Sequence, residues 1–322
     1  MFTFRSSPYG STSHALANQN AFNTFYGGKA LFFSTGHHSS FIDAHSLYSH
    51  RSTRAHNTIL INGMGQKIGT EGYGWIPRHY EGPKISYVAG DASNAYGEII
   101  SPIWKERAQK SQLSLSPENG WDKNHLLTYR RHIVILGDAG LVFIYDELEA
   151  DTLGHWNYLL HTIEKPMIIG QKENEIQVRA INETGMSEAY LFSNDELEVE
   201  MTNKFFAPAV NWLKANNEGH FEPYKNHWHF TATTPRQTTC RLATIINTHD
   251  RKEHGIVPER ISDTEIRVGN WSITLNLSPK GKASFSIENK ADDIKLTYDD
   301  ATTIQEKGIT TIIKDERLEL EI

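Results

Sequence analysis

Short runs of apolar, aromatic and β-branched residues recur along the whole chain, and glycine, proline or asparagine separates many of them. This pattern predicts β-strands, because such side chains fit a pleated surface and the separating residues favour turns. The expected strands are 21–25, 30–33, 58–61, 85–88, 126–136, 141–145, 156–161, 175–180, 189–192, 227–233, 241–247, 265–268, 271–277, 283–287, 294–298, 310–313 and 318–322. Helical spacing of apolar residues never persists beyond a few turns, so the chain is predicted to be all-β.

Two kinds of strand differ in their pattern. Residues 141–145 are apolar at every position, which predicts a central strand covered on both faces. Residues 266–268 and 273–277 alternate between apolar and polar, which predicts one face in water. Many short strands without a repeat of fixed period predict a large antiparallel β-sandwich rather than a propeller or a solenoid.

The segment 204–224 is the predicted linker between two domains. It contains Pro208, Pro223 and the polar run 216–219, all of which favour loops over strands. We therefore expect a boundary near Glu222. A large β domain would cover residues 1–222, and a smaller β domain over 223–322 would support it.

Length and composition are those of an ordinary globular protein. With 322 residues, 38% hydrophobic and 22% charged, the chain is long enough for two domains. No apolar run approaches the ~20 residues that span a bilayer, and residues 1–4 are not a signal peptide, so we expect no membrane partner. Cys240 is the only cysteine, which excludes an internal disulfide.

The net charge of -7 argues against nucleic acid as a partner and gives no general attraction for a polyanion. An acidic ligand would therefore need a local basic patch. Residues 37–56 offer one, because Asp43 is the only acid among these basic residues: His37, His38, His45, His50, Arg51, Arg54 and His56. The patch is either a solvated, histidine-rich loop or a binding surface.

One stretch carries most of the candidate chemistry. Residues 9–22, YGSTSHALANQNAF, join a turn to a single imidazole, His14, and to the carboxamides of Asn18, Gln19 and Asn20. With FRSSP at 4–8, this stretch resembles the C-terminal part of the heparinase II/III type of polysaccharide lyases. Similar pieces follow in the same order: AHNTIL at 55–60, NG at 62–63, DA at 91–92, YG at 96–97, RRHIV at 130–134, YDELE at 145–149, WNYLLH at 156–161 and HF at 229–230. The resemblance implies a supersandwich of the hyaluronate-lyase type followed by a smaller β domain.

The resemblance also implies an activity, the cleavage of an acidic, uronic-acid-containing polysaccharide by β-elimination. A base removes the proton at C5, an acid protonates the leaving oxygen, and a donor neutralises the carboxylate so that the proton becomes acidic. Tyrosine commonly supplies the base or the acid. His14 matches the motif histidine and is the expected catalytic residue; its alternative role is to cap a turn.

The substrate-binding residues that we expect are Arg5, Gln19, Asn20, His37, His38 and Arg54. Gln19 and Asn20 also suit a supporting role, in which their amides fix the loop. Arg5 suits either a sugar carboxylate or an internal salt bridge.

Many members of the family hold zinc near this site through a histidine two positions after the motif histidine, an aspartate in the next strand and a later histidine. In this chain those positions are Leu16, Ser34 and His56. Leucine cannot ligate a metal and one imidazole does not make a site, so we expect no zinc and no other cofactor. A replacement site that uses His37 or His38 stays open.

Two further patterns permit a functional interpretation. Asp146 and Glu147 resemble the paired carboxylates of glycoside hydrolases, but neighbours on a strand point to opposite faces. We expect them at a strand end, holding a turn. His227 and His229 are predicted on one face of a strand with Trp228 on the other, where a core position is favoured over sugar stacking.

Lyases of this type place a helical toroid before the β part, and that toroid completes the active site. We expect this helical domain as the partner of the 322 residues, and we expect the isolated chain to have little or no lyase activity. The resemblance implies a periplasmic or secreted protein. The alternative function is a carbohydrate-binding or scaffold module without a catalytic role.

Overall fold

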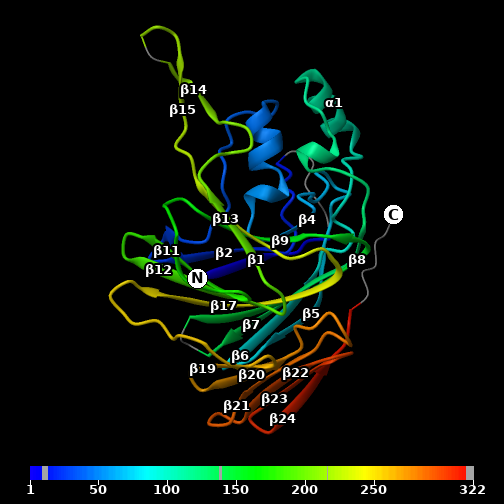
Figure 1. The fold of residues 1–322 in the computed structure, drawn as a ribbon, viewed down its shortest axis with the longest axis vertical. Helices are drawn as coiled ribbons and strands as arrows, with labels where there is room; N and C mark the ends of the chain where they lie inside the picture. The colour runs from blue at the N-terminus through cyan, green and yellow to red at the C-terminus, as the bar shows by residue number, and fades with distance from the viewer. Residues whose placement is uncertain (9–13, 138–139, 216, 317–322) are drawn as a thin grey trace.

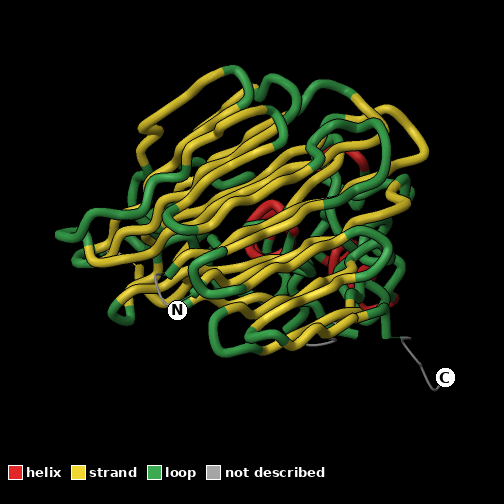
Figure 2. Tube along the Cα trace, turned by 90° about the horizontal axis from the view of Figure 1, so that it is seen from below, coloured by secondary structure: helices red, strands yellow, loops and turns green. Residues whose placement is uncertain are grey.

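The structure, a computed structural model, describes residues 1–8, 14–137, 140–215 and 217–316. Layers of antiparallel β-sheet are stacked along the long axis, with a helical region and a projecting hairpin at one end (Figure 1). Seen from the opposite end, strands make up most of the trace and the helical turns lie behind them (Figure 2). The all-β prediction is confirmed.

The middle layer is an eight-stranded sheet in the order β10-β11-β12-β17-β8-β7-β6-β5. Its strands are β5 (Trp75–Glu81), β6 (Ile85–Asp91), β7 (Leu126–Leu136), β8 (Leu141–Gly154), β10 (Met167–Lys172), β11 (Glu175–Asn182), β12 (Gly185–Ser193) and β17 (Gln237–Asp250).

One outer layer combines a four-stranded sheet, β13-β16-β9-β4, with a three-stranded sheet, β1-β2-β3. Its strands are β1 (Phe2–Arg5), β2 (Ala21–Tyr26), β3 (Lys29–Ala30), β4 (Ile59–Ile61), β9 (Trp156–Thr162), β13 (Glu198–Thr202) and β16 (Trp228–Thr233). Strand β3 is shorter than the strand predicted over 30–33.

The other outer layer is a seven-stranded sheet in which each strand pairs with the next along the chain. Its strands are β18 (Glu259–Ser262), β19 (Glu265–Val268), β20 (Trp271–Leu275), β21 (Phe285–Asn289), β22 (Ile294–Tyr298), β23 (Thr302–Glu306) and β24 (Ile309–Ile313). In β19, Ile266 and Val268 are buried and Arg267 is exposed, so the prediction of one wet face is confirmed. The strand predicted over 318–322 lies outside the described residues.

Strand β8 shows why residues 141–145 are apolar throughout. Val142 and Ile144 belong to the core between the middle sheet and the four-stranded layer, whereas Phe143 and Tyr145 belong to the core against the seven-stranded sheet. Successive side chains of a strand point to opposite faces, so a strand covered on both sides needs an apolar residue at every position. The predicted central strand is confirmed.

The chain passes from the first two layers to the third at a later residue than the boundary we expected. A boundary near Glu222 would cut off β16, which pairs with β13 and β9, and β17, which lies between β12 and β8. The predicted linker instead forms the hairpin of β14 (Val210–Ala215) and β15 (Phe221–Pro223) at the helical end. Because β17 ends at Asp250 and β18 begins at Glu259, the change of layer falls between these two residues.

Asp146 and Glu147 lie in the middle of β8, not at a strand end holding a turn as we expected. Asp146 is fully buried and accepts two hydrogen bonds from Arg131, at 2.7 and 2.9 Å. Glu147 points to the other face and accepts a hydrogen bond of 2.7 Å from the hydroxyl of Tyr298. The opposite orientation of the two carboxylates is confirmed, and Glu147 ties the seven-stranded sheet to the middle layer.

Short helices gather at one end of the molecule (Figure 1). They are α1 (Pro102–Lys110), η1 (Ser46–His50), η2 (Thr53–Ala55) and η3 (Pro117–Asn119). The sequence did not predict α1, because only Trp104 and Ala108 on it are buried and such a narrow apolar stripe gives little periodic signal. No helix in the described part of the chain is long and apolar enough to cross a bilayer.

Candidate functional site

The motif segment around His14 lies at the helical end. Ala15 and Ala17 are buried in an apolar cluster that includes Trp104 of α1 and Leu47 of η1. His14 is exposed. Two small buried residues therefore anchor the segment and leave its imidazole in solvent. Residues 9–13, including the turn predicted at 9–11, lie outside the described part of the chain.

Arg51, which is only 1% exposed, holds the segment around His14 in place through hydrogen bonds. Its guanidinium donates to the carbonyl of Ala15 at 2.9 Å and to the hydroxyl of Ser46 at 3.1 Å, and its own carbonyl accepts the N–H of Ala17 at 2.8 Å. A third nitrogen, Nη2, lies 3.3 Å from Nε2 of His38. A guanidinium can only donate, so His38 accepts at Nε2 and carries its proton on Nδ1.

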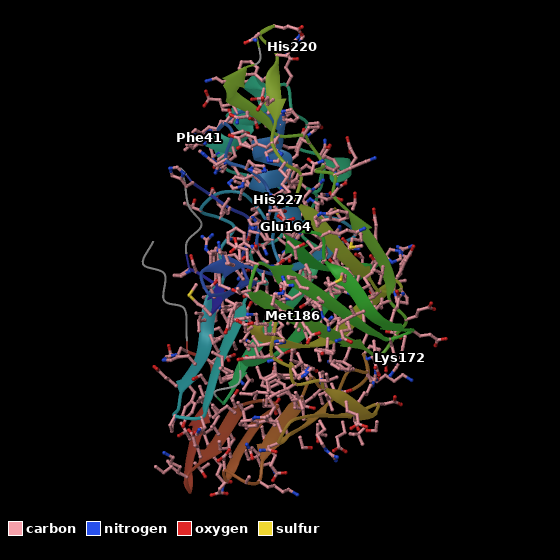
Figure 3. The ribbon with its side chains drawn as sticks, turned by 90° about the vertical axis from the view of Figure 1, so that its left-hand side faces the viewer. Phe41, Glu164, Lys172, Met186, His220 and His227 are labelled. Atoms are coloured by element: carbon pink, nitrogen blue, oxygen red, sulfur yellow. The ribbon has the colours of Figure 1, made fainter. Side chains whose placement is uncertain are left out.

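Phe41 is the centre around which four basic side chains meet. The rings of His14 and His38 lie 5.5 and 4.8 Å from the Phe41 ring, and 5.8 Å from each other. The guanidinium carbons of Arg51 and Arg107 lie 5.3 and 5.6 Å from the same ring. We call these five residues the Phe41 site. It lies toward the hairpin end of the molecule, away from the seven-stranded sheet (Figure 3).

The Phe41 site carries more positive than negative charge. Arg107 of α1 stacks over Trp104 at 4.6 Å, and its Nη1 is buried without a hydrogen-bond partner within the described part of the chain. Among the described residues, neither Arg51 nor Arg107 lies within ion-pair distance of a carboxylate. Burial and the proximity of Arg107 lower the pKa of Arg51 to about 10, a shift that nearby Asp43 opposes. The excess of positive charge at the Phe41 site therefore favours an anion over a cation.

The neutral form of His38 is favoured in this environment. Desolvation and then the charge of Arg51 lower its pKa. A neutral imidazole with its proton on Nδ1 offers one N–H donor, so His38 can contribute a hydrogen bond to an anion.

The structure corrects the prediction that Gln19 and Asn20 bind substrate, because both side chains are fully buried. The amide oxygen of Gln19 accepts the N–H of Ser7 at 2.9 Å, and its nitrogen donates to the carbonyl of Gly72 at 3.1 Å. Asn20 has a left-handed φ of 56° and donates to the carbonyl of Gly90 at 3.1 Å. These bonds leave both amides in the interior, where they fix the loop.

Arg5 lies on the same segment but outside the Phe41 site. Its guanidinium donates to the side-chain oxygen of Asn18. The partner of Arg5 is therefore a neutral amide and not the carboxylate of the internal salt bridge that we considered. Burial lowers its pKa. A role for Arg5 in holding a sugar carboxylate stays a prediction.

His37 belongs to a different group of side chains from its neighbour His38. Its ring stacks on Tyr224 at 4.4 Å and lies 4.6 Å from His227, and its Nε2 donates to the carbonyl of Lys225 at 2.9 Å. Gly36 permits this turn, because its φ is +89° and a Cβ there would lie 2.8 Å from the Cα of His50. Of the six predicted substrate-binding residues, only His38 lies beside His14.

Around His37 is an imidazole cluster, which we define as His37, His45, His161, His227 and His229. Phe205 lies among them, with ring distances of 4.7 to 5.8 Å to four of the five. His161 and His229 are 5.1 Å apart. His45 is 1% exposed, as are Arg51 and His56, so the basic patch at 37–56 is not a solvated loop.

His227, which directly precedes β16, and His229 within β16 both contact Phe205, which confirms that they lie on one side of this segment. Trp228 on the other face is only half-buried, and the ammonium group of Lys165 lies 5.2 Å from its ring. The core position expected for Trp228 is therefore not found.

The stability of the protein is expected to fall as the pH falls from about 6.5 to 4. Burial, followed by neighbouring basic groups, lowers the pKa of His50, His227 and His229 to about 4. In the unfolded chain these imidazoles bind protons near pH 6.5, so between the two values the unfolded state binds more protons and gains stability. The free energy of unfolding, measured by urea titration, should drop by at least about 3 kcal/mol over this window.

The variant His229→Phe isolates this effect. Nε2 of His229 is buried without a partner among the described residues, so a phenyl ring should be tolerated at pH 7. The dependence of unfolding free energy on pH should be shallower in this variant than in the unmodified chain. An identical slope would show that His229 does not titrate as its burial requires.

The residues present do not fit the zinc site of the relatives. Nδ1 of His56 lies 2.9 Å from the hydroxyl of Ser34, so these two positions are adjacent as two ligands would be. Burial lowers the pKa of His56 to about 3, and its Nε2 has no partner in the described part of the chain. A hydroxyl, the hydrocarbon of Leu16 and one imidazole are not a zinc donor set. Within the described ranges, no group of three His, Cys, Asp or Glu side chains could hold a metal ion.

We therefore predict that a chelator leaves the melting temperature of the purified chain unchanged. The double variant Leu16→His, Ser34→Asp restores the donors that relatives use and should make the melting temperature rise on addition of zinc. Zinc bound stoichiometrically to the unmodified chain, together with a lower melting temperature after chelation, would contradict the prediction.

A buried network joins several of the sequence pieces that resemble the lyase family. Arg131 holds Asp146 through two hydrogen bonds and donates to the carbonyls of Asn20 at 2.7 Å and Asn57 at 3.0 Å. The side-chain oxygen of Asn57 accepts the N–H of His161 at 2.8 Å. These pieces therefore meet in the interior, where they hold together the strands and loops that carry His14.

The sequence did not single out Phe41, Trp104 or Arg107 as site residues. Arg107 lies on a helix that the sequence did not predict, and Phe41 is an isolated aromatic residue in a loop. The signal that was available is the pattern Trp104-x-x-Arg107, since residues three apart on a helix lie on one face.

Comparison with known proteins gives a family and a fold. A model of the family described as "Heparinase II/III-like, C-terminal" matches residues 1–252, which end just after β17. No curated protein matches the chain.

Solved structures with a similar fold include heparan sulfate lyase HepC from Pedobacter heparinus, with a TM-score of 0.53 and 13% identity over 99% of this chain and 40% of that one. A heparinase III, the BT4657 gene product, has a TM-score of 0.56 and 12% identity over 92% of this chain and 39% of that one. Another heparinase III has a TM-score of 0.52 and 14% identity, over 91% and 37%. The chain thus spans about two fifths of the length of the structures it matches.

Proposed function

Because the chain belongs to the heparinase II/III-like family through its C-terminal domain, we propose that it is the β module of a lyase that cleaves an acidic, uronic-acid-containing polysaccharide by β-elimination. The observation that carries this proposal is the Phe41 site, where exposed His14 and two guanidinium groups lie around one aromatic ring and neither guanidinium has a carboxylate partner in the described part of the chain.

The chemistry of elimination explains why such a site suits a uronate. The C5 proton is weakly acidic while the neighbouring carboxylate is charged, and it becomes removable when donors neutralise that group and the enolate-like intermediate. Arg107 and the Nδ1–H of His38 are donors of this kind. To His14, which is exposed, we assign either a share in neutralisation or the transfer of a proton.

A tyrosine to serve as base or acid is not among the side chains that contact Phe41 in the described part of the chain. We propose that a helical domain, which relatives place before the β part, supplies it, and that the 322 residues alone have little activity. We propose a periplasmic or secreted location, as the resemblance implies, because a substrate of polymeric size is found outside the cytoplasm.

The experiment that tests this function incubates the complete gene product with heparosan, alginate and a neutral glucan. Elimination leaves an unsaturated uronate that absorbs ultraviolet light, so absorbance should rise with at least one acidic polymer and not with the glucan. No rise with any acidic polymer would remove the lyase proposal.

A carbohydrate-binding module without catalysis is the second candidate function. The observation that favours it is the loss of zinc donors at Leu16 and Ser34, which is what decay of a catalytic site would produce. If this function is right, the complete gene product should bind acidic oligosaccharides and should give no rise in ultraviolet absorbance in the cleavage assay.

A further inference from the structure

A pocket of 570 Å³ opens on the outer face of the four-stranded sheet. On its floor, Thr231 of β16 lies directly opposite Leu159 of β9, and Leu60 of β4 completes an apolar strip. Leu159 and Leu60 are 4% and 7% exposed, yet they lie outside the sandwich cores, so the walls of the pocket shield them. The volume is within the range of about 300–1,000 Å³ that small-molecule sites occupy.

Phe206 forms an aromatic wall of this pocket. Its ring lines the pocket, and its side chain is 51% exposed. An exposed ring next to an apolar floor suits a ligand with an apolar face, such as the C–H face of a pyranose.

Arg54 gives the same wall a positive charge. Its guanidinium carbon lies 3.9 Å from the centre of the Phe206 ring, and Nη2 donates to the carbonyl of Asn119 at 2.6 Å. Burial lowers its pKa to about 10, and no carboxylate within the described ranges forms an ion pair with it. A partly desolvated cation without a counter-ion favours an anionic ligand.

The rim offers hydrogen bonds for hydroxyl groups. The side-chain oxygen of Asn62 accepts the N–H of His155 at 2.8 Å, and the NH2 group of Asn62 is not engaged by any described residue. Lys204 and Glu198, both exposed, add one charge of each sign. An apolar floor, a net charge of one positive unit from Arg54, Lys204 and Glu198, and polar edges together match the surface of an acidic sugar.

We propose that this pocket is a second saccharide-binding site, which holds an acidic sugar residue of the polysaccharide apart from the Phe41 site. The inference rests on the proposed function for the class of its ligand. The two sites share no lining residue, but they are joined through the short helices: Arg51 ends η1, and Arg54 lies in η2. A chain long enough to occupy both would be anchored on either side of these helices.

The test is calorimetric titration of the purified chain with acidic trisaccharides from heparosan and alginate and with the neutral trisaccharide maltotriose. Phe206→Ala should weaken binding of an acidic trisaccharide by about 3- to 10-fold. Phe221→Ala, the same change at an exposed phenylalanine of the hairpin, is the matched control and should have no effect. Arg54→Met should remove the preference for acidic over neutral ligands and the dependence on salt.

Arg107→Gln separates this site from the Phe41 site. The effect of Phe206→Ala should persist in the Arg107→Gln background, because the pocket does not use Arg107. If Arg107→Gln alone abolishes binding and the Phe206 and Arg54 variants bind normally, the pocket is not a saccharide site and the proposed function stands. Absence of binding by every acidic trisaccharide overturns the inference, and the cleavage assay then decides the proposed function.

Discussion

Replacing Arg131 by methionine is expected to lower the free energy of unfolding by about 3–5 kcal/mol. Arg131 and its partner Asp146 are both fully buried, and their two hydrogen bonds are 2.7 and 2.9 Å long. Methionine approximates the aliphatic part of arginine but leaves the carboxylate of Asp146 buried and unpaired. The carbonyls of Asn20 and Asn57 lose a donor at the same time.

Chemical unfolding of the purified chain measures this change. The matched control is Lys29→Met, which removes one partner of the exposed ion pair with Glu183 and should cost at most about 1 kcal/mol. Adding Asp146→Leu to Arg131→Met should recover part of the loss, because the unpaired charge is removed. A loss below about 1 kcal/mol for Arg131→Met would mean that the network does not hold the layers together.

Replacing His14 by alanine is expected to lower the kcat of the complete gene product on its acidic polysaccharide by about 10²–10⁴-fold. His14 is exposed, and its ring contacts are with His38 and Phe41 in the site itself. Its loss should therefore remove neutralisation or proton transfer and leave the fold intact. The initial rate of ultraviolet absorbance increase gives kcat, and a melting curve checks the fold.

The control for His14 is His254→Ala, an exposed histidine in the loop after β17. This variant should keep the unmodified rate. If His14→Ala also keeps that rate, His14 has no part in the mechanism and the turn-capping alternative is favoured.

The pattern of apolar and polar positions predicted most of the architecture. It predicted the central strand at 141–145 and the strand at 266–268 that has one face in water. A strand buried on both faces is apolar at every position, whereas a strand buried on one face alternates. It did not locate the division between layers. Pro208, Pro223 and the polar run 216–219 favour a loop, and the described residues of this segment include the strands β14 and β15 of a hairpin rather than a linker. Strand order, which places β17 between β12 and β8, depends on pairings between residues far apart in the chain.

The candidate site was predictable only where a motif marked it. The resemblance pointed to His14, and the structure brings His38 to it. Arg107 reaches the site from a helix some ninety residues along the chain, a juxtaposition that local sequence does not encode. Gln19 and Asn20 were named among the substrate-binding residues because they follow His14 in the motif. Their burial fits the supporting role that was also expected, in which amides satisfy backbone groups inside a loop.

The most direct test of the proposed function asks whether the complete gene product breaks a uronate polysaccharide by removing a proton, without adding water. Mass spectrometry of the fragments of an acidic oligosaccharide of known mass distinguishes the two reactions. Elimination should give fragments with an unsaturated end whose masses add up to the mass of the parent. Fragments whose summed masses exceed the parent by one water for each cleavage would show hydrolysis and would contradict the proposed function.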